Sequence, residues 1–577
     1  MADESEPERI DRRRYLQYLT AGTVSVALAG CSGGTGNNAT TGTGSGSTTN
    51  GASGSSTSDD GSGGSSSPSE GGTFVVGMSS KASTLDLQKA TRRPEQTILS
   101  SLHEPMFRID GSKQPQPHLA AEYSSNDDAT EFTFQLEEGV MFHNGDELTA
   151  TDVVWSWERF VENSPASFLL APADEFTANG DYEVTVTFEN PYPLLPRYLT
   201  NPLTGFSSKS AVEEAGESYG QDIVVGTGPF KWEGWKRGTA VNVSRFEEYD
   251  WAPEFAENQG PAKVEGLRFE YHPEATTLLN ELTSGDVHGS SYITLSDADE
   301  VEKATNTELL RKEYTRPGYL AINVTKRPTD DVLVREAITH ATQKQPVIEA
   351  ALAGEGYPIW SIVPPIAVNA IGKTEAKQIG QTVNLETARA KLDEAGWTNS
   401  GQGQTRTKGG EKLALTFYAF TIPRYKKMGK VIAPMLGEVG IQANLEVLEA
   451  GTLYNNLESG NHHMTTMAYG GNWAVNAMEP ILKGENTAAE GGTNYSLWRN
   501  DEFDELLTEA KTSPEKQARQ DAITEAQRIV LEEVPVTPIC AFNKIYGYKG
   551  SVSGIDPWTQ HPWWPDQEWM NRLEFSV

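Results

Sequence analysis

The sequence predicts a mixed α/β fold from two kinds of hydrophobic pattern. Apolar and polar residues alternate in several short runs, as at Phe132, Phe134 and Leu136, and this period of two is typical of a half-buried strand. Residues 413–418 and 441–448 show strand patterns on either side of a helical pattern over residues 426–439. Because a helix that connects two strands in this way implies parallel pairing, this region predicts a βαβ unit.

The other elements follow in chain order. Strands with apolar or alternating patterns are expected at residues 73–77, 184–188, 267–271 and 536–542. Thr149 and Asp152 form a start that resembles a capping box, and the helix after it places three apolar residues on one face: Val153, Trp157 and Phe160. Gly440 ends the helix of the βαβ unit. The first half therefore mixes hairpins and helices, and the second half is α/β.

The first 72 residues predict export and anchoring. Arg12, Arg13 and Arg14 precede a mild apolar run that ends in Leu28-Ala29-Gly30-Cys31, which resembles a twin-arginine signal followed by a lipobox. The apolar run is shorter than the about 20 residues of a spanning helix. We therefore expect a signal peptide over residues 1–30, lipidation of Cys31, and a flexible Gly/Ser/Thr linker over residues 31–72 with a reach of roughly 35 Å.

The composition is strongly acidic. The chain carries 80 Asp and Glu against 47 Lys and Arg, for a formal net charge of −33. Such a surface repels nucleic acid and anionic lipid, so neither is an expected ligand. The acidic residues are spread along the whole chain, as in proteins from high-salt organisms, and together with the signal they suggest a lipoprotein of haloarchaeal type. At about 1 M salt the Debye length is roughly 3 Å, so a ligand must be held by short-range contacts.

No motif in the sequence predicts catalysis or a cofactor. Residues 367–374 fit a loose phosphate-binding loop pattern, but Pro364-Pro365 stands where the preceding strand should end. His462 and His463 are adjacent and have no evident third metal ligand, so we interpret them as structural or surface residues. Cys540 lies in an apolar run and is interpreted as an inert core thiol. We therefore predict that the protein is not an enzyme, contains no metal and needs no cofactor.

Residues 131–160 carry the most specific pattern of the chain, EFTFQLEEGVMFHNGDELTATDVVWSWERF. This stretch closely resembles the signature of the family 5 solute-binding proteins of ABC importers, which include oligopeptide- and dipeptide-binding proteins. Further segments agree in order with the same family: Leu85-Asp86, 226–230, Ile322-Asn323, 331–338, 392–397 and 535–538. The resemblance covers essentially everything after Gly72.

The resemblance implies a bilobed fold like that of periplasmic binding proteins of type II, cluster C. In it two α/β lobes are joined by a hinge and enclose the ligand. It places lobe I at residues 73–108, 197–316 and 538–577, and lobe II at residues 317–537. An extra subdomain over residues 109–196 is inserted in lobe I. Ligand contacts from both lobes would then select the closed state, which the permease recognises.

The resemblance also implies a set of ligand-binding residues. In peptide-binding members a Trp lies three residues before an Asp that pairs with the peptide ammonium, and a Glu-Pro pair follows. Here Trp473 and Glu479 match, but Asn476 stands in place of the Asp, so recognition of a free amine is in doubt. Arg92 and Arg93 match the loop of the first lobe that pairs with the peptide backbone, or they meet a ligand carboxylate instead. Tyr319 is expected beside the hinge, facing the cleft.

These observations lead to one main hypothesis and two alternatives. The main hypothesis is a monomeric receptor that captures peptides on the extracellular face of the cytoplasmic membrane and delivers them to ABC permease subunits with their ATPases. An oligosaccharide ligand is the first alternative, because Asn476 is neutral and the chain has 13 Trp and 20 Tyr. A lipid-anchored secreted hydrolase is the second, but it would need a nucleophile or an acid–base pair that the sequence does not reveal.

Overall fold

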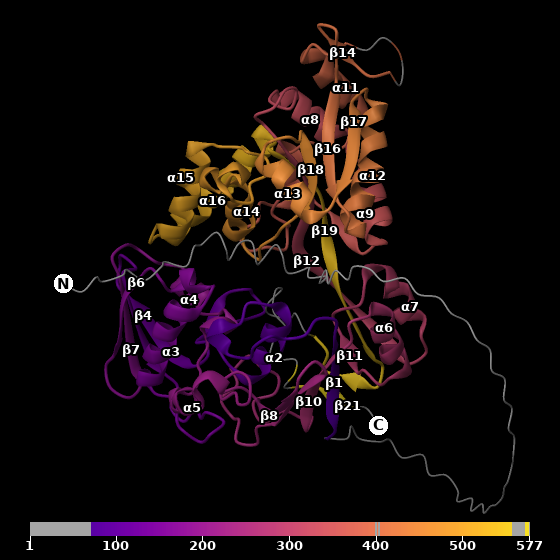
Figure 1. The fold of residues 1–577 in the computed structure, drawn as a ribbon. Coiled ribbons are helices and arrows are strands. Elements are labelled where there is room, and N and C mark those ends of the chain that lie inside the picture. The colour runs from indigo at the N-terminus through magenta and orange to yellow at the C-terminus, as the bar shows by residue number, and fades with distance from the viewer. Residues whose placement is uncertain (1–70, 399–400, 402–403, 557–569, 571, 576–577) are drawn as a thin grey trace, which may run out of the picture.

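The computed structural model describes residues 71–398, 401, 404–556, 570 and 572–575. Two bodies are joined by two long strands, β12 (Thr307–Ile322) and β19 (Val536–Lys549) (Figure 1). We call lobe I the body whose core extends from Phe74 to Phe269 and also contains Tyr546, Val552, Met570 and Leu573. Lobe II is the body whose core extends from Tyr319 to Phe542. The predicted signal, Cys31 and the linker lie outside the described residues and stay predictions.

One sheet of eleven strands runs through both bodies. Its order is β17, β16, β18, β12, β19, β11, β1, β10, β9 and β8, and β13 (Gly356–Pro358) pairs beside this path with β19. The lobe I strands are β1 (Thr73–Met78), β8 (Phe230–Lys236), β9 (Ala240–Arg245), β10 (Gly266–Tyr271) and β11 (Gly289–Ser290). The lobe II strands are β16 (Ala414–Phe420), β17 (Gln442–Leu448) and β18 (Met464–Ala468).

The two connecting strands are antiparallel, and their ladder is interrupted where the lobes meet. The register shifts between Glu313 and Pro317 of β12, so the three residues between them have no regular partner on β19. Bulges of this kind bend a strand and re-aim its side chains. The interruption therefore places Tyr314, Thr315 and Arg316 in an irregular segment between the lobes. We call this segment, together with the facing part of β19, the junction.

Lobe I contains a second sheet, with the order β4 (Ala120–Ser125), β5 (Glu131–Leu136), β7 (Glu183–Phe188) and β6 (Ala173–Ala178). The predicted alternation on β5 is confirmed, since all three of its apolar side chains are buried. Helix α3 (Ala150–Asn163) begins with the predicted capping box of Thr149 and Asp152. Its own residue Trp157 is fully buried. The same core continues to the main sheet of lobe I, and the division into a separate subdomain stays a proposal.

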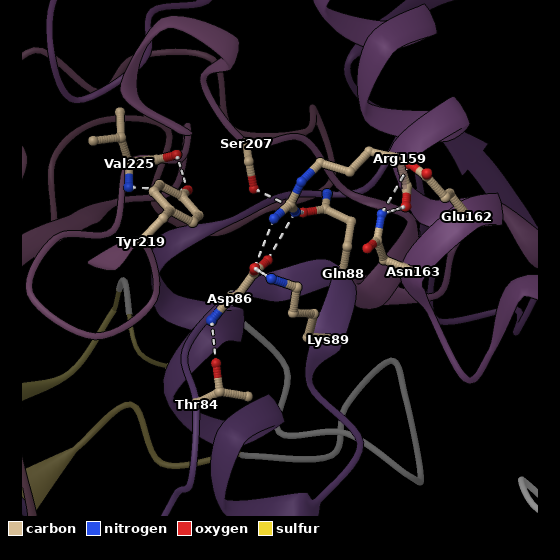
Figure 2. Close-up of polar contacts among 10 residues, drawn as sticks. All are labelled: Thr84, Asp86, Gln88, Lys89, Arg159, Glu162, Asn163, Ser207, Tyr219 and Val225. Atoms are coloured by element: carbon tan, nitrogen blue, oxygen red, sulfur yellow. Dashed lines mark hydrogen bonds and ion pairs between the residues drawn. The ribbon is translucent and has the colours of Figure 1, made fainter. Parts of the chain in front are cut away.

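A buried ion pair fixes α3 to the segment that follows β1 (Figure 2). Arg159 of α3 donates to both carboxylate oxygens of Asp86, with Nη1–Oδ1 and Nη2–Oδ2 distances of 2.8 and 2.6 Å. It also donates to Oε1 of Gln88, which accepts a further bond from Ser207. Because Arg159 spreads two parallel bonds over one carboxylate, the pair defines the orientation as well as the distance of the two elements.

The βαβ unit of lobe II is confirmed. Strands β16 and β17 pair in parallel from Ala414 with Gln442 to Phe420 with Leu448. The helix between them, α12 (Pro423–Glu438), begins three residues earlier than predicted. Proline is favoured in the first turn of a helix because its missing N–H would be unpaired there, and this explains the earlier start. Gly440, with φ of +89°, follows the helix end as expected.

Helices cover both faces of the lobe II sheet. Helices α9 and α12 lie on one side, and α13 to α16 lie on the other (Figure 1). The helices of lobe II are α8 (Val332–Ala341), α9 (Lys344–Leu352), α10 (Lys373–Ile379), α11 (Leu385–Glu394), α13 (Ala450–Glu458), α14 (Ala474–Leu482), α15 (Asp501–Thr512) and α16 (Lys516–Glu533). Those of lobe I besides α3 are α2 (Arg93–Leu102), α4 (Leu195–Tyr198), α5 (Lys209–Ala215), α6 (Ala275–Ser284) and α7 (Ala298–Lys303). In the described part of the chain, no helix combines the length and apolar character needed to cross a membrane.

Candidate functional site

The two lobes contact each other around Trp473, the residue before α14. Its side chain is 7% exposed. The ring of Tyr198 on α4 lies 6.2 Å from it in an edge-on arrangement, and the Arg197 guanidinium lies 6.0 Å from the ring centroid. A second contact is made by Lys113, whose ammonium donates to the backbone oxygen of Ile366. Trp473 thus lies where a helix of lobe I meets lobe II.

A loop of lobe II holds Trp473 in place. The N–H of Val368 donates to the oxygen of Asn472 at 2.8 Å, and the N–H of Ala474 donates to the oxygen of Val368 at 2.9 Å. This loop belongs to the 367–374 segment that fits a phosphate-binding pattern. No strand leads into it in the structure, and it ends in the seven-residue helix α10. The segment therefore positions Trp473 and lacks the strand that a nucleotide loop requires.

Gly470 brings the Trp473 segment against the junction. A Cβ atom at Gly470 would lie 2.1 Å from the oxygen of Thr315 and 2.7 Å from the Cα of Arg316. Only glycine permits such a close backbone approach. As a result, the segment that leads into α14 lies directly on β12 beside Arg316. This contact was not predicted from the sequence, although the pair Gly470-Gly471 immediately before Asn472-Trp473 is a signal for close packing.

The structure gives Asn476 and Glu479 partners within lobe II. Oδ1 of Asn476 accepts a hydrogen bond from the backbone N–H of Trp473 at 3.3 Å and so caps the start of α14. Glu479 forms ion pairs with Lys511 at 2.5 Å and with Lys483 at 3.7 Å. Both side chains therefore stabilise the helix that carries Trp473. Neither presents an unpaired negative charge to a ligand ammonium.

The two predicted arginines of lobe I differ in their contacts. Arg92 precedes α2 and donates to the backbone oxygen of Lys81 at 3.3 Å. Arg93 donates to Oγ of Ser291 at 3.0 Å, and its guanidinium lies 5.2 Å from the ring centroid of Tyr292. Both arginines are exposed. Arg93 therefore contacts the residues that follow β11, whereas Arg92 is bonded to the backbone of the segment before α2.

Tyr319 lies on β12, three residues beyond Arg316, and its side chain is 2% exposed. Burial raises the pKa of its phenol, and the neighbouring Tyr425 and Tyr469 raise it further. The residue is therefore part of the buried wall beneath the junction. Trp473 lies at the contact of the two lobes and Tyr319 on the connecting strand β12, whereas Asn476 and Glu479 make their contacts within lobe II.

Three cations are grouped at the junction. The ammonium of Lys544 on β19 lies 4.3 Å from the ring centroid of Tyr314. Burial lowers the pKa of Lys544 well below its ordinary value, and the charges of Arg93 and Arg316 lower it further. The same two arginines act on the phenol of Tyr314. The sequence analysis named only Arg93 of this group, because Arg316 and Lys544 are more than 200 positions apart from each other and from Arg93.

The histidine pair and Cys540 have structural positions, as interpreted from the sequence. His463 accepts a hydrogen bond from the N–H of Thr416 and lies 2.8 Å from the oxygen of Arg327. The ring of His462 lies 2.7 Å from the oxygen of Tyr495. Cys540 is fully buried on β19, and burial raises the pKa of its thiol to about 12, so the thiolate nucleophile is suppressed. Among the described residues no group of three His, Cys, Asp or Glu could hold a metal ion.

Known proteins with the same architecture were found by sequence and by structure. The glutathione-binding protein GsiB of Escherichia coli K12 is 24% identical over 493 residues, which cover 83% of this chain and 91% of GsiB. The structure of CtaP, an ABC transporter substrate-binding protein of Listeria monocytogenes, superimposes with a TM-score of 0.75 at 19% identity, covering 88% of this chain and all of CtaP.

The oligopeptide-binding protein AppA of Bacillus subtilis, solved with a nonapeptide, gives a TM-score of 0.64 at 19% identity over 89% of this chain and all of AppA. These likenesses confirm the bilobed α/β fold. The profile of the bacterial extracellular solute-binding proteins, family 5 Middle, matches residues 114–488. This match covers more than half of the chain and includes the contact between α4 and Trp473. The chain therefore belongs to family 5 of the bacterial extracellular solute-binding proteins.

Proposed function

We propose that the protein captures short peptides outside the cell and delivers them to the permease of an ABC importer. The observation that carries this proposal is the site itself, which is built from both lobes and from the two strands that connect them. Two contacts support this site: Tyr198 of lobe I packs against Trp473 of lobe II, and Arg93 of lobe I lies over the ring of Tyr292. The relatives support a peptide ligand, because GsiB is named for glutathione and AppA was solved with a nonapeptide.

Capture would proceed by a hinge movement. A ligand that contacts both lobes favours the closed arrangement over the open one, by an amount set by its difference in affinity for the two. The irregular segment of β12 between Glu313 and Pro317 is a suitable hinge, because residues outside a regular ladder can change their backbone angles at low cost. The permease would then recognise the closed form.

The oligosaccharide alternative receives less support from the geometry. A sugar would stack on a free aromatic face. Of the two aromatic residues predicted for the site, Trp473 already has Tyr198 and Arg197 against its ring, and Tyr319 is 2% exposed. We therefore carry the peptide hypothesis forward.

The ligand can be identified directly by native mass spectrometry of protein purified from its host in high salt. We expect a co-purified mass that fragments into amino-acid residues. A sugar mass would refute the peptide assignment. Calorimetry with a tripeptide and its N-acetylated form then tests the amino end, and equal affinities would show that Asn476 does not recognise an ammonium.

We further propose that Cys31 anchors the protein to the outer face of the cytoplasmic membrane after export by the twin-arginine route. The lipobox sequence before Cys31 and the Gly/Ser/Thr segment after it support this proposal. The substitution Cys31→Ser should release the protein into the medium. Unchanged retention in the membrane fraction would refute the anchor.

A further inference from the structure

A small cavity in lobe II lies apart from the contact between the two lobes. Its polar walls are Thr339 of α8, Lys344 of α9 and the loop residues Trp360 and Gln381, and apolar residues at the end of α16 and the start of β19 form the rest. Trp473 is not among the residues that line it. The space admits about one water molecule or one small ion.

Lys344 is the unusual member of this wall. Its residue surface is 5% exposed, and no other lysine among the described residues is as deeply buried. Lysine is rarely buried to this extent unless it is paired. The ammonium carries three N–H donors, and one of them donates to the backbone oxygen of Pro538. In the described part of the chain, no further hydrogen bond or ion pair to this ammonium is found.

The buried arginines of the described residues are satisfied in a way that this lysine is not. Arg335 donates to four backbone oxygens. Arg406 donates to the carboxylate of Asp393 and to two backbone oxygens. Arg108 acts on the buried Glu104 and lowers its pKa. Burial of a cation in this protein is thus otherwise accompanied by a set of acceptors or by a carboxylate.

The charge of Lys344 is not balanced by the protein groups around it. Burial lowers its pKa to about 8, so the amine is still mostly charged at neutral pH. The thiol of Cys540 opposes this shift, but burial raises the pKa of the thiol to about 12, so it is uncharged at neutral pH. Among the described residues, no carboxylate acts on the pKa of Lys344. A buried charge in this state is costly unless a counter-charge reaches it.

Two further lysines make the surroundings of the cavity positive. Lys377 and Lys373 of α10 lie over the ring of Trp360, with 4.0 and 5.4 Å between each ammonium and the ring centroid. Both lysines are exposed. An anion that approaches the Trp360 wall therefore meets positive charge, although the chain as a whole is strongly acidic.

The carboxylates of the helices around the cavity are engaged elsewhere or exposed. Glu336 of α8 and Glu375 of α10 each pair with another cation, at 2.7 and 2.6 Å. Glu533 accepts hydrogen bonds from a tryptophan and an asparagine side chain, and Glu532 is exposed. Gln381 donates one amide N–H to Glu336 at 3.3 Å, so its second N–H remains a donor for another group.

We propose that this cavity binds one small inorganic anion, chloride in the first instance, on the ammonium of Lys344 with the amide of Gln381 beside it. A water molecule could accept the hydrogen bonds of the ammonium, but only an anion also balances its charge. Chloride suits the space because it is a single atom little larger than water. The bound ion would hold α8, α9 and α16 to the start of β19, and the inference is independent of the proposed peptide function.

Bromide is the first probe, because it replaces chloride and scatters X-rays anomalously. Crystals of the full chain are soaked in KBr in place of KCl. We expect an anomalous peak within hydrogen-bond distance of Nζ of Lys344. The absence of a peak there would overturn the proposal, and this measurement on the parent protein does not depend on the folding of any variant.

A second experiment measures chloride binding in solution through stability. The urea midpoint of unfolding is followed at constant potassium concentration while chloride replaces gluconate, which is too large for the cavity. The midpoint of the parent should rise with chloride, because a ligand that binds only the folded state stabilises it. Lys344→Met should lose this rise, with chloride affinity at least about tenfold weaker. The matched control is Lys516→Met, which changes an exposed lysine at the first position of α16, as Lys344 is at the first position of α9.

Gln381→Met provides a second variant, because Gln381 is half-buried and this variant should fold even if Lys344→Met does not. We expect its chloride affinity to fall about threefold to tenfold, as the loss of one hydrogen bond does. An equal rise of the midpoint in the parent and in both cavity variants would show a general salt effect and reject the site. A bromide peak without a chloride-dependent midpoint would show binding at crystal concentration only and would also reject it.

Discussion

In the body of lobe I the buried charges are paired, whereas at the junction comparable charges are not. Glu104 is completely buried and accepts hydrogen bonds from Tyr249 at 2.7 Å and Trp251 at 2.9 Å, with the ring of His118 at 3.0 Å. Arg316 at the junction has no such partner among the described residues. The comparison separates a charge whose partners stabilise the fold from a charge that makes no such contribution.

The difference also predicts which substitutions lower the stability of the folded state and which leave it unchanged. Removing one member of a paired buried group leaves its partners desolvated and unsatisfied, so the folded state loses stability. Removing a side chain that has no hydrogen-bond or ion-pair partner leaves nothing unsatisfied, so the stability should change little.

The largest effect is expected at Glu104. Glu104→Ala leaves the hydroxyl of Tyr249, the indole N–H of Trp251 and the hydroxyl of Thr227 without their acceptor. We expect the free energy of unfolding to fall by about 3–5 kcal/mol, measured by urea denaturation. Glu138→Ala, at an exposed position, is the matched control and should stay within about 0.5 kcal/mol of the parent. A loss at Glu104 no larger than in this control would contradict the role assigned to the buried carboxylate.

A somewhat smaller loss is expected when the pair shown in Figure 2 is broken. Arg159→Met keeps the aliphatic packing of α3. It leaves the carboxylate of Asp86 with only the exposed Lys89 at 3.2 Å, and the oxygen of Gln88 with only Ser207. We expect a loss of about 3 kcal/mol. In a double-mutant cycle with Asp86→Asn, the combined loss should be clearly smaller than the sum of the single losses. Additive losses would show that the two residues do not act as a pair.

The stability should also depend on pH through buried histidines. Burial lowers the pKa of His462 to about 4 and that of His143 to about 4, from an ordinary value of 6.5. Between about pH 4 and about pH 6.5 the unfolded chain binds more protons than the folded one. The free energy of unfolding therefore rises with pH in this range and is lost on acidification. His462 should account for about 2 kcal/mol of the loss between about pH 7 and about pH 5. His462→Phe should therefore give a flatter profile of unfolding free energy, and an unchanged slope would refute this assignment.

The local elements could be predicted from the sequence because their signals are local. The alternation on β5, the capping box at Thr149 and the βαβ unit around α12 all depend on residues within one or two turns of each other. The family was recognised from the same kind of contiguous signal in residues 131–160. The bounds differed by a few residues, as at the helix start, where proline at the first position explains the difference, and β19 continues seven residues beyond its predicted end.

The site could be predicted only in part, because it depends on contacts between distant segments. Trp473 was identified, but its contact with α4 and the packing of Gly470 on β12 are tertiary features. The grouping of Arg316 with Lys544 arises from the pairing of β12 with β19, whose register no local pattern determines. Asn476 stays a predicted ligand-binding residue, and the structure adds that its oxygen caps α14.

The smallest effect on stability is expected at the junction. Arg316→Gln should change the free energy of unfolding by no more than about 0.5 kcal/mol, since no ion pair or hydrogen bond to the side chain is lost. Urea denaturation of this variant beside the parent measures the change. A loss similar to that of Arg159→Met would show that Arg316 has a structural partner.

The most direct test compares the stability of two arginine variants. The free energy of unfolding is measured for Arg159→Met and for Arg316→Gln under the same buffer conditions. We predict that Arg159→Met loses about 3 kcal/mol of stability, whereas Arg316→Gln stays within about 0.5 kcal/mol of the parent. If both variants lose stability to the same extent, the distinction between the paired and the unpaired arginine is wrong.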